Sequence, residues 1–169
     1  MRCGLDPPTP VGVRPDTDPR RVSVVDGIVV TTFREEMPMI TSSYPVLMSD
    51  DVAATAGWFI RTFGFEPTFE SDWYVSMRSG RFELAVLAVG HETIPAGFST
   101  AAGGILINIE VDDVDAEYRR IVALGGTRLE QDIRSEAFGQ RHFIVSAPGG
   151  VLIDVIQPIE PTGAFAASS

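Results

Sequence analysis

The residues best placed for chemistry are polar side chains inside otherwise apolar segments. Asn108 and Glu110 alternate with isoleucine in segment 105–111, and Asp154 interrupts the apolar segment 151–157. If these segments are strands, alternation puts Asn108 and Glu110 on the face opposite the isoleucines. A polar group on an inward strand face needs a ligand, a partner or water. We therefore expect these three residues in a ligand-binding site.

Covalent catalysis finds little support in the residue types. All 13 basic residues are arginine, so no lysine can form a Schiff base. The one cysteine, Cys3, lies near the amino terminus, and the sequence contains no Ser-His-Asp, Cys-His or phosphate-loop pattern. Of the two histidines, we expect His91 at the solvated surface and His142 in a structural role. The residue types favour binding over group transfer.

Aromatic side chains offer a surface for a flat ligand. Planar molecules stack on such faces, and an adjacent methionine adds an adaptable wall. Taken singly, each aromatic is more often a core residue than a pocket residue. The pocket candidates are Tyr44, Trp73, Tyr74 and Phe138, with Met48 as the apolar wall. Three aromatics of a predicted helix are assigned to the core: Trp58, Phe59 and Phe63.

A repeated module must position these residues. The segment from Asp51 to Gly64 recurs as Asp113 to Gly126. Each copy begins with an Asp-Val pair and ends with a glycine 13 positions after the aspartate. In the first copy, apolar residues have helical spacing from Val52 onward, Ser49-Asp50 can supply the N-cap, and Gly64 ends the helix. The repeat predicts helices over 52–63 and 114–124, and it indicates pseudo-twofold architecture.

Apolar segments around the helices predict strands. In the first module they are 46–49, 65–69, 73–78 and 82–88, and in the second 105–111, 127–133, 140–146 and 151–157. Each module, about residues 43–90 and 104–158, is therefore βαβββ. We predict an α+β fold in which two tandem modules form a curved mixed sheet, or cup, with helices on the outer face.

The ends of the chain differ from this pattern. Residues 1–38 are rich in proline, which is typical of a disordered extension, although the apolar run 22–33 would suit an edge strand. A start at Met37 or Met39 is an alternative reading of the same residues. We expect one domain over 39–161 and a flexible tail over 162–169.

Charge and composition narrow the partners. A net charge of −10 at pH 7 disfavours nucleic acid and anionic membranes and mildly favours cationic ligands, although acidity also aids solubility. No apolar run approaches the roughly 18 to 20 residues that span a bilayer. A single cysteine excludes an internal disulfide, and the opening residues lack a signal-peptide pattern. We expect a cytoplasmic protein.

The paired modules with their Asp-Val-x-Ala helix starts resemble the vicinal oxygen chelate superfamily over about residues 43–158. That superfamily includes glyoxalase I, extradiol dioxygenases and the bleomycin- and mitomycin-binding resistance proteins. Its enzymes hold a divalent metal in the cup. The resemblance places the ligand positions on Tyr44, Leu106 and Asp154, with a fourth near Glu83. Leucine cannot coordinate a metal and tyrosine rarely does, so we expect no metal and no cofactor.

A second likeness is more specific. The segments 138–145 and 147–154 resemble the aromatic-Gly-Gln-Arg motif and the Pro-x-Gly turn with its following strand in the drug-binding resistance branch. In that branch the cup is metal-free and aromatic side chains sandwich a flat ligand. Arg141 of this motif, and Leu106 at the ligand position of the second module, complete the candidate ligand-binding residues. For Arg141 the alternative is an ion pair with one of the strand carboxylates.

The sequence thus predicts a binding protein that sequesters a planar or cationic small molecule without metal. One alternative is a glyoxalase-like lyase or dioxygenase whose unconventional metal site uses Asp154, Glu83 or Glu110. Another is a scaffold that binds a partner protein. We expect a homodimer, with the cup built within one chain or between two.

Overall fold

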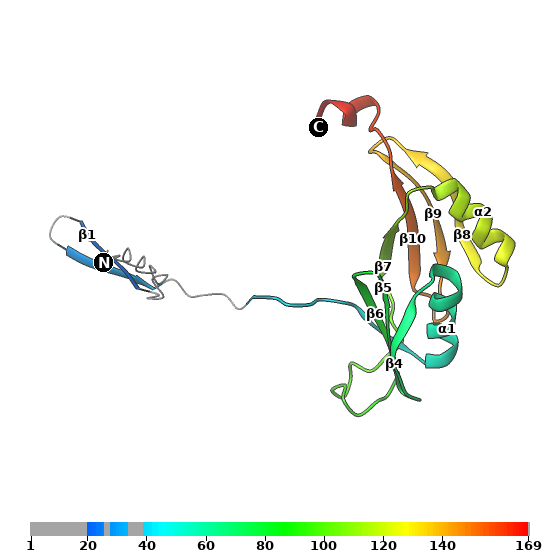
Figure 1. Cartoon of the computed structure of the whole chain (residues 1–169), viewed down its shortest axis with the longest axis horizontal. Coiled ribbons are helices and arrows are strands. Elements are labelled where there is room, and N and C mark those ends of the chain that lie inside the picture. Colours follow the sequence, from blue (N-terminus) through cyan, green and yellow to red (C-terminus); the bar gives the residue numbers. More distant parts are fainter. Residues whose placement is uncertain (1–19, 26–27, 34–38, 169) are drawn as a thin grey trace, which may run out of the picture. The chain divides into compact units, whose positions relative to one another are not determined.

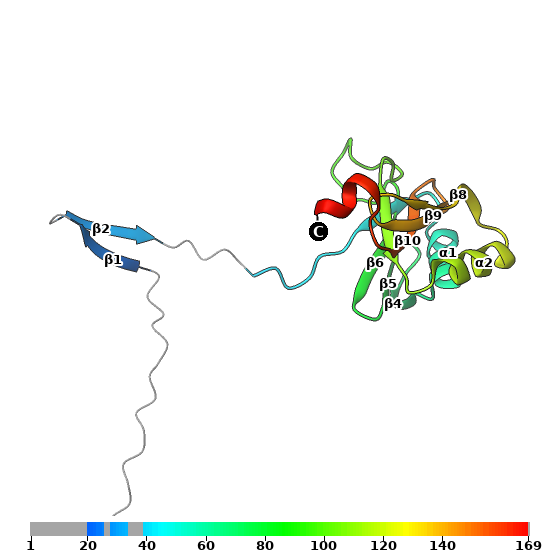
Figure 2. The same ribbon diagram turned by 90° about the horizontal axis from the view of Figure 1, so that it is seen from above.

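The computed structural model describes residues 20–25, 28–33 and 39–168. The chain divides after Thr41 into two compact units. The first contains an antiparallel hairpin of β1 (Arg20–Val25) and β2 (Ile28–Phe33), shown in Figure 2. The sequence suggests a single edge strand for the apolar run 22–33. The structure instead has two strands there that pair with each other. The rest of the predicted disordered extension lies outside the described residues.

The second unit contains the first predicted module. Its elements are β3 (Val46–Ser49), α1 (Val52–Phe63), β4 (Glu66–Glu70), β5 (Tyr74–Ser79) and β6 (Phe82–Ala88), as Figure 1 shows. The sheet has the order β3-β6-β5-β4, in which β3 and β6 are parallel and the other neighbours are antiparallel. This is the predicted βαβββ order.

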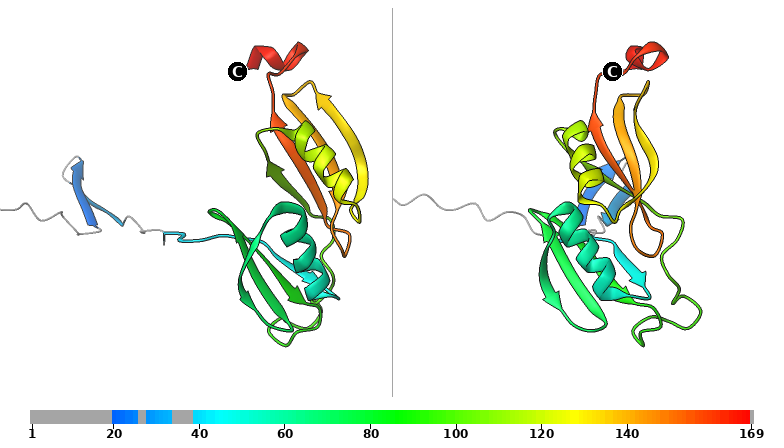
Figure 3. Two further views of the ribbon diagram at one scale, coloured as in Figure 1. Left: turned by 45° about the vertical axis from the view of Figure 1, so that its right-hand side comes forward. Right: turned by 90° about the vertical axis from the view of Figure 1, so that its right-hand side faces the viewer.

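The second module has the same topology. It consists of β7 (Leu106–Glu110), α2 (Val114–Leu124), β8 (Arg128–Glu136), β9 (Gln140–Ser146) and β10 (Leu152–Pro158), in the sheet order β7-β10-β9-β8. Each helix packs on one face of its own sheet (Figure 3). The predicted α+β fold of two tandem modules is confirmed, with two four-stranded mixed sheets.

Both helices begin directly after the aspartate of the repeat, and the N-cap of α1 is Asp51 rather than the predicted Ser49-Asp50. The side chains of Asp51 and Asp113 each accept a hydrogen bond, at 2.8 Å, from the backbone N–H three residues further on. Gly64 ends α1 in a left-handed conformation with φ 66°, which glycine adopts without strain. The caps fix where each helix starts and therefore which of its residues face the sheet.

The core lies between the helices and the sheets. As predicted, Trp58 and Phe59 of α1 are buried, and Phe63 packs against the same cluster. Phe143 of β9 is fully buried in the second module. The indole Nε1 of Trp58 donates to Thr127 Oγ1 at 3.1 Å and so links the two modules. No helix within the described ranges is long and apolar enough to cross a membrane.

The chain ends in a short 3-10 helix, η1 (Gly163–Ser168), where a flexible tail is predicted. The Ile159 backbone N–H donates to the Gly139 carbonyl oxygen at 2.9 Å, and Phe165 meets Phe138 edge-on with ring centroids 6.4 Å apart. Gly139 has φ 103°, and a Cβ there would lie 3.0 Å from the Ile159 carbonyl oxygen. The tail is thus docked on the turn between β8 and β9.

Candidate functional site

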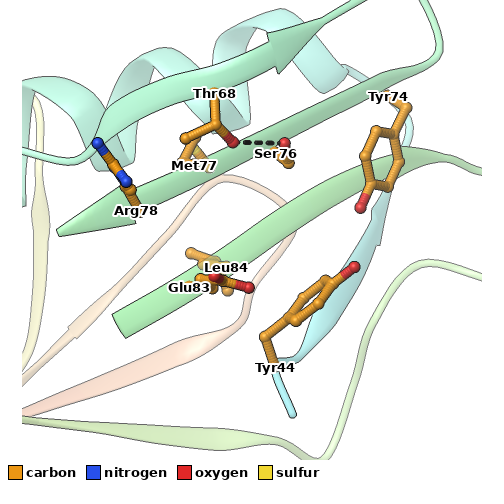
Figure 4. Close-up of a pocket in the computed structure, with 8 residues that line it drawn as sticks. All are labelled: Tyr44, Thr68, Tyr74, Ser76, Met77, Arg78, Glu83 and Leu84. Atoms are coloured by element: carbon orange, nitrogen blue, oxygen red, sulfur yellow. Dashed lines mark hydrogen bonds between the residues drawn. The ribbon is translucent and has the colours of Figure 1, made fainter. Parts of the chain in front are cut away.

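The first sheet carries a cavity of about 360 Å³ on its open face, the face directed away from the helix. The register places Tyr74, Ser76 and Arg78 of β5 on this face, because Val75 and Met77 between them belong to the core. Figure 4 shows the cavity and its lining: Tyr44, Thr68, Tyr74, Ser76, Met77, Arg78, Glu83 and Leu84.

Two tyrosines form one end of the cavity. Tyr44 lies just before β3 and Tyr74 begins β5, and their hydroxyl groups point toward each other in Figure 4. Burial raises the pKa of the Tyr74 phenol, and the neighbouring Tyr44 hydroxyl and the charge of Glu83 raise it further. Tyr74 is therefore a neutral phenol near pH 7 and can donate a hydrogen bond to a ligand.

Polar side chains form the rest of the wall. Thr68 Oγ1 and Ser76 Oγ are hydrogen-bonded at 2.7 Å. Arg78 of β5 stands directly opposite Glu83 of β6, yet within the described part of the chain these two side chains form no ion pair. Glu83 Oε2 instead accepts a hydrogen bond from Ser42 Oγ at 3.3 Å. The cavity thus presents hydroxyl groups, a guanidinium and a carboxylate.

An aromatic row, formed by Phe69, Tyr74, Trp73 and His91, continues from the tyrosine end of the cavity. Ring centroids are 6.2 Å apart for Phe69 and Tyr74, 5.6 Å for Tyr74 and Trp73, and 4.0 Å for Trp73 and His91. The last pair is stacked, with an interplanar angle of 12°. His91, expected simply at the surface, therefore stacks on the Trp73 ring. Phe69 and Trp73 are both exposed, so the row can receive a ligand ring.

The structure brings together the predicted site residues of the first module. Tyr44 and Tyr74 line the cavity, and Trp73 lies in the aromatic row beside Tyr74. Met48 is half-buried in β3 opposite Leu87, which pairs with Tyr74 on the same open face. Thr68, Ser76 and Arg78 were not predicted. The alternation of Tyr74, Ser76 and Arg78 along one strand was the available signal.

The open face of the second sheet holds the other predicted strand residues. The register aligns Asp154 with Asn108 and places Leu106 and Glu110 on the same face of β7. Leu106, Asn108 and Glu110 are exposed, whereas Asp154 is buried. These residues belong to a different sheet from the cavity, so the ten predicted site residues do not form one group.

Asp154 is bound to a buried histidine. Its Oδ1 lies 2.8 Å from His142 Nδ1. An ionised carboxylate only accepts, so Nδ1 carries the proton of this bond. His142 Nε2 then faces the Gln131 amide at 3.2 Å and Glu136 Oε1 at 3.5 Å. The expected structural role of His142 agrees with this network, which fills part of the second open face.

Arg141 and Phe138 lie apart from both groups. Arg141 donates to the two carboxylate oxygens of Asp115, at 2.8 and 2.7 Å, at the start of α2. It therefore faces the helix, and the alternative pairing with Glu110 or Asp154 is wrong. Phe138 is exposed in the turn before β9 and contacts the C-terminal segment. The sequence motif around these residues stabilises the turn and helix α2 in this structure.

The ion pair between Arg141 and Asp115 makes the stability of the protein depend on pH in the acidic range. Hydrogen bonding from Arg141 lowers the pKa of Asp115 below its ordinary value of 3.8. A carboxyl group whose pKa is lowered by folding stabilises the protein at pH values above 3.8. This contribution is lost as the pH falls through the pKa of the folded state. The difference in Tm between wild type and Asp115→Asn should shrink below pH 3.8, as thermal melts at several pH values will show. In the control Asp112→Asn, a Tm difference with the same pH dependence would contradict this assignment.

The fold and the paired open faces define the class of this protein. Two tandem βαβββ modules, with helices on one side and side-chain clusters on the other, are the vicinal oxygen chelate fold. The family model described as "Glyoxalase/Bleomycin resistance protein/Dioxygenase superfamily" matches residues 41–155, and the chain belongs to this family.

Solved structures share the fold at low sequence identity. TioX from Micromonospora sp. ML1 is 22% identical with a TM-score of 0.56, covering 69% of this chain and 97% of TioX. A lactoylglutathione lyase from Agrobacterium tumefaciens is 21% identical with a TM-score of 0.58, covering 72% and 96%. A family enzyme from Burkholderia phytofirmans PsJN is 20% identical with a TM-score of 0.60, covering 69% and 98%. No curated protein matches the chain.

The residues present do not fit the divalent metal of the family's enzymes. Of the positions that the resemblance assigns to ligands, Leu106 has no donor atom and Asp154 is held by His142. Within residues 39–168, no three His, Cys, Asp or Glu side chains are grouped so that they could hold a metal ion.

Proposed function

We propose that the chain is a small-molecule binding protein that sequesters a planar or cationic compound without a metal. The observation that carries this proposal is Tyr44, which stands where the family's enzymes place a metal ligand and instead lines a cavity with Tyr74. The cavity volume of about 360 Å³ lies within the range of ligand pockets, roughly 300 to 1,000 Å³. The aromatic row and the acidic charge of the chain support a flat or cationic ligand.

The direct test is calorimetric titration of the purified chain with bleomycin, mitomycin and other flat natural products. Silence across a broad panel would contradict the proposal. An antibiotic-resistance role follows only if such a compound binds and expression of the chain protects cells against it.

Tyr74→Ala should weaken the binding of any flat ligand found in that panel. Loss of one aromatic wall is expected to raise Kd about two- to twelvefold, since an aromatic contact contributes about 0.5 to 1.5 kcal/mol. Phe82→Ala is the matched control, because Phe82 is an exposed aromatic of the same sheet that does not line the cavity. Equal weakening by both substitutions would place the ligand elsewhere.

The competing proposal is a glyoxalase-like lyase or dioxygenase with a metal at Asp154, Glu83 or Glu110. Its support is that these three carboxyl side chains lie on the open faces of the two sheets. Metal analysis separates the two proposals. Stoichiometric metal that is lost in Asp154→Ala would favour the enzyme.

The same proposal includes a cytoplasmic homodimer. Ile105 and Leu106 at the edge strand β7 are 41% and 49% exposed, and Leu152 beside them is 36% exposed. Exposed apolar side chains on an unpaired sheet edge favour association with another chain. A single cysteine suits a reducing compartment. Light scattering that gives the monomer mass of 18.3 kDa at micromolar concentration would refute the dimer.

A further inference from the structure

The cavity of the first sheet is rich in hydroxyl groups. Tyr44 and Tyr74 supply two phenols, and the hydrogen-bonded pair of Thr68 and Ser76 supplies two more hydroxyls. A hydroxyl both donates and accepts, so such a wall matches a ligand that also offers donors and acceptors on adjacent atoms. A purely apolar ring would offer no partner to the donors and acceptors of these hydroxyls that remain free.

The charges around the cavity are interleaved. Arg78 on β5 stands between Glu66 on β4 and Glu83 on β6 in the strand register. None of these charges forms an ion pair with another described residue within 4 Å. A cationic group in the cavity would meet Arg78, and an anionic group would meet the two carboxylates. A neutral ligand with neighbouring hydroxyls avoids both repulsions, because it can donate to Glu83 and accept from Arg78.

The aromatic row gives the same ligand a second contact. Trp73 and His91 extend the surface of Tyr74 beyond the cavity, and Phe69 flanks it from β4. From Tyr74 to Arg78 the strand advances by four residue steps, or about 13 Å at roughly 3.3 Å per residue. This length accommodates a flat ring and a hydroxylated ring side by side.

We propose that this cavity binds a neutral aromatic molecule that carries a sugar. The sugar hydroxyls occupy the cavity between Arg78, Glu83 and Ser76, and the flat ring lies on the aromatic row. The inference rests on the proposed binding function and narrows its ligand class. It assigns the ligand to the first sheet, because the His142 network occupies part of the corresponding face of the second.

The test titrates the full chain with five small compounds. Amide chemical shifts measure the affinity of each compound and show which residues it contacts. Phenyl β-D-glucopyranoside carries both parts, anisole the ring alone, and methyl β-D-glucopyranoside the sugar alone. Phenylethylamine and phenylacetate supply a cation and an anion on the same ring. We expect the phenyl glucoside to bind at least fivefold more tightly than each of the other four. Its shifts should be concentrated in residues 68–84.

Substitutions in the cavity locate the sugar. Glu83→Gln and Arg78→Gln should each reduce the affinity for the phenyl glucoside about threefold or more while leaving that for anisole unchanged. Arg81→Gln is the control, since Arg81 lies over the Phe82 ring outside the lining, and it should change neither affinity. All three side chains are exposed, so melting temperatures should remain near that of wild type.

Other outcomes overturn the inference in distinguishable ways. Equal or tighter binding of anisole or phenylethylamine would refute the sugar while leaving the binding of a planar or cationic compound intact. Shifts confined to the second sheet would refute the assignment to this cavity. The absence of binding by all five probes would refute the inference, whereas the wider function is decided by the natural-product titration.

Discussion

Replacement of Phe59 by alanine should lower the free energy of unfolding by about 3 to 5 kcal/mol, the usual cost of truncating a buried phenylalanine. Phe59 is 0% exposed. It meets Trp58 and Phe65 edge-on, with ring centroids 5.0 and 6.0 Å apart. The helix that carries it is held by caps at both ends, so the backbone cannot easily move to fill the space. The loss therefore includes both apolar burial and the cavity left behind.

Chemical denaturation of the full chain measures this loss, and Phe82→Ala is the matched control. Phe82 is 62% exposed and its ring lies under the Arg81 guanidinium, so its removal should cost less than about 1 kcal/mol. A Phe59→Ala variant that unfolds at the same denaturant concentration as the control would show that α1 does not pack on its sheet as described.

The fold could be predicted from the sequence because its signals are local. The two Asp caps, the glycine that ends α1 and the apolar spacing of each helix act within a few residues. The duplication added a second, independent reading of the same pattern. Strand boundaries differ from the prediction most in β8, whose pairing with β9 has two register shifts that no local pattern indicates.

The candidate site was only partly predictable, because it depends on register. Arg141 and His142 are neighbours in sequence but lie on opposite faces of β9, one toward Asp115 and the other toward Asp154. One sequence does not reveal which face of β9 aligns with Asp154, since a shift of one residue exchanges them. The Arg78–Glu83 placement likewise follows from the pairing of β5 with β6. Polar residues on a strand could be recognised, whereas their partners could not.

Asp154→Ala should destabilise the protein by about 3 kcal/mol, because it leaves the buried His142 ring without its acceptor. The side chains of His142 and Asp154 are only 9% and 8% exposed, so water cannot readily replace the lost carboxylate. Asp154→Asn retains an oxygen at the same position and should cost about 1 kcal/mol. Asp72→Ala, at an exposed position outside both open-face groups, is the control and should be nearly neutral.

Stability and ligand affinity, measured for these variants, separate a structural role of Asp154 from a role in the ligand site. If Asp154 mainly orders His142, Asp154→Ala lowers stability and leaves binding in the first-sheet cavity unchanged once the protein is folded. In the double variant with His142→Ala the two losses should be strongly non-additive, because each single change already removes the same hydrogen bond. Additive losses would contradict the pairing. A variant that keeps full stability but loses ligand would instead return Asp154 to the binding site, on the second sheet, and would refute the assignment of the ligand to the first.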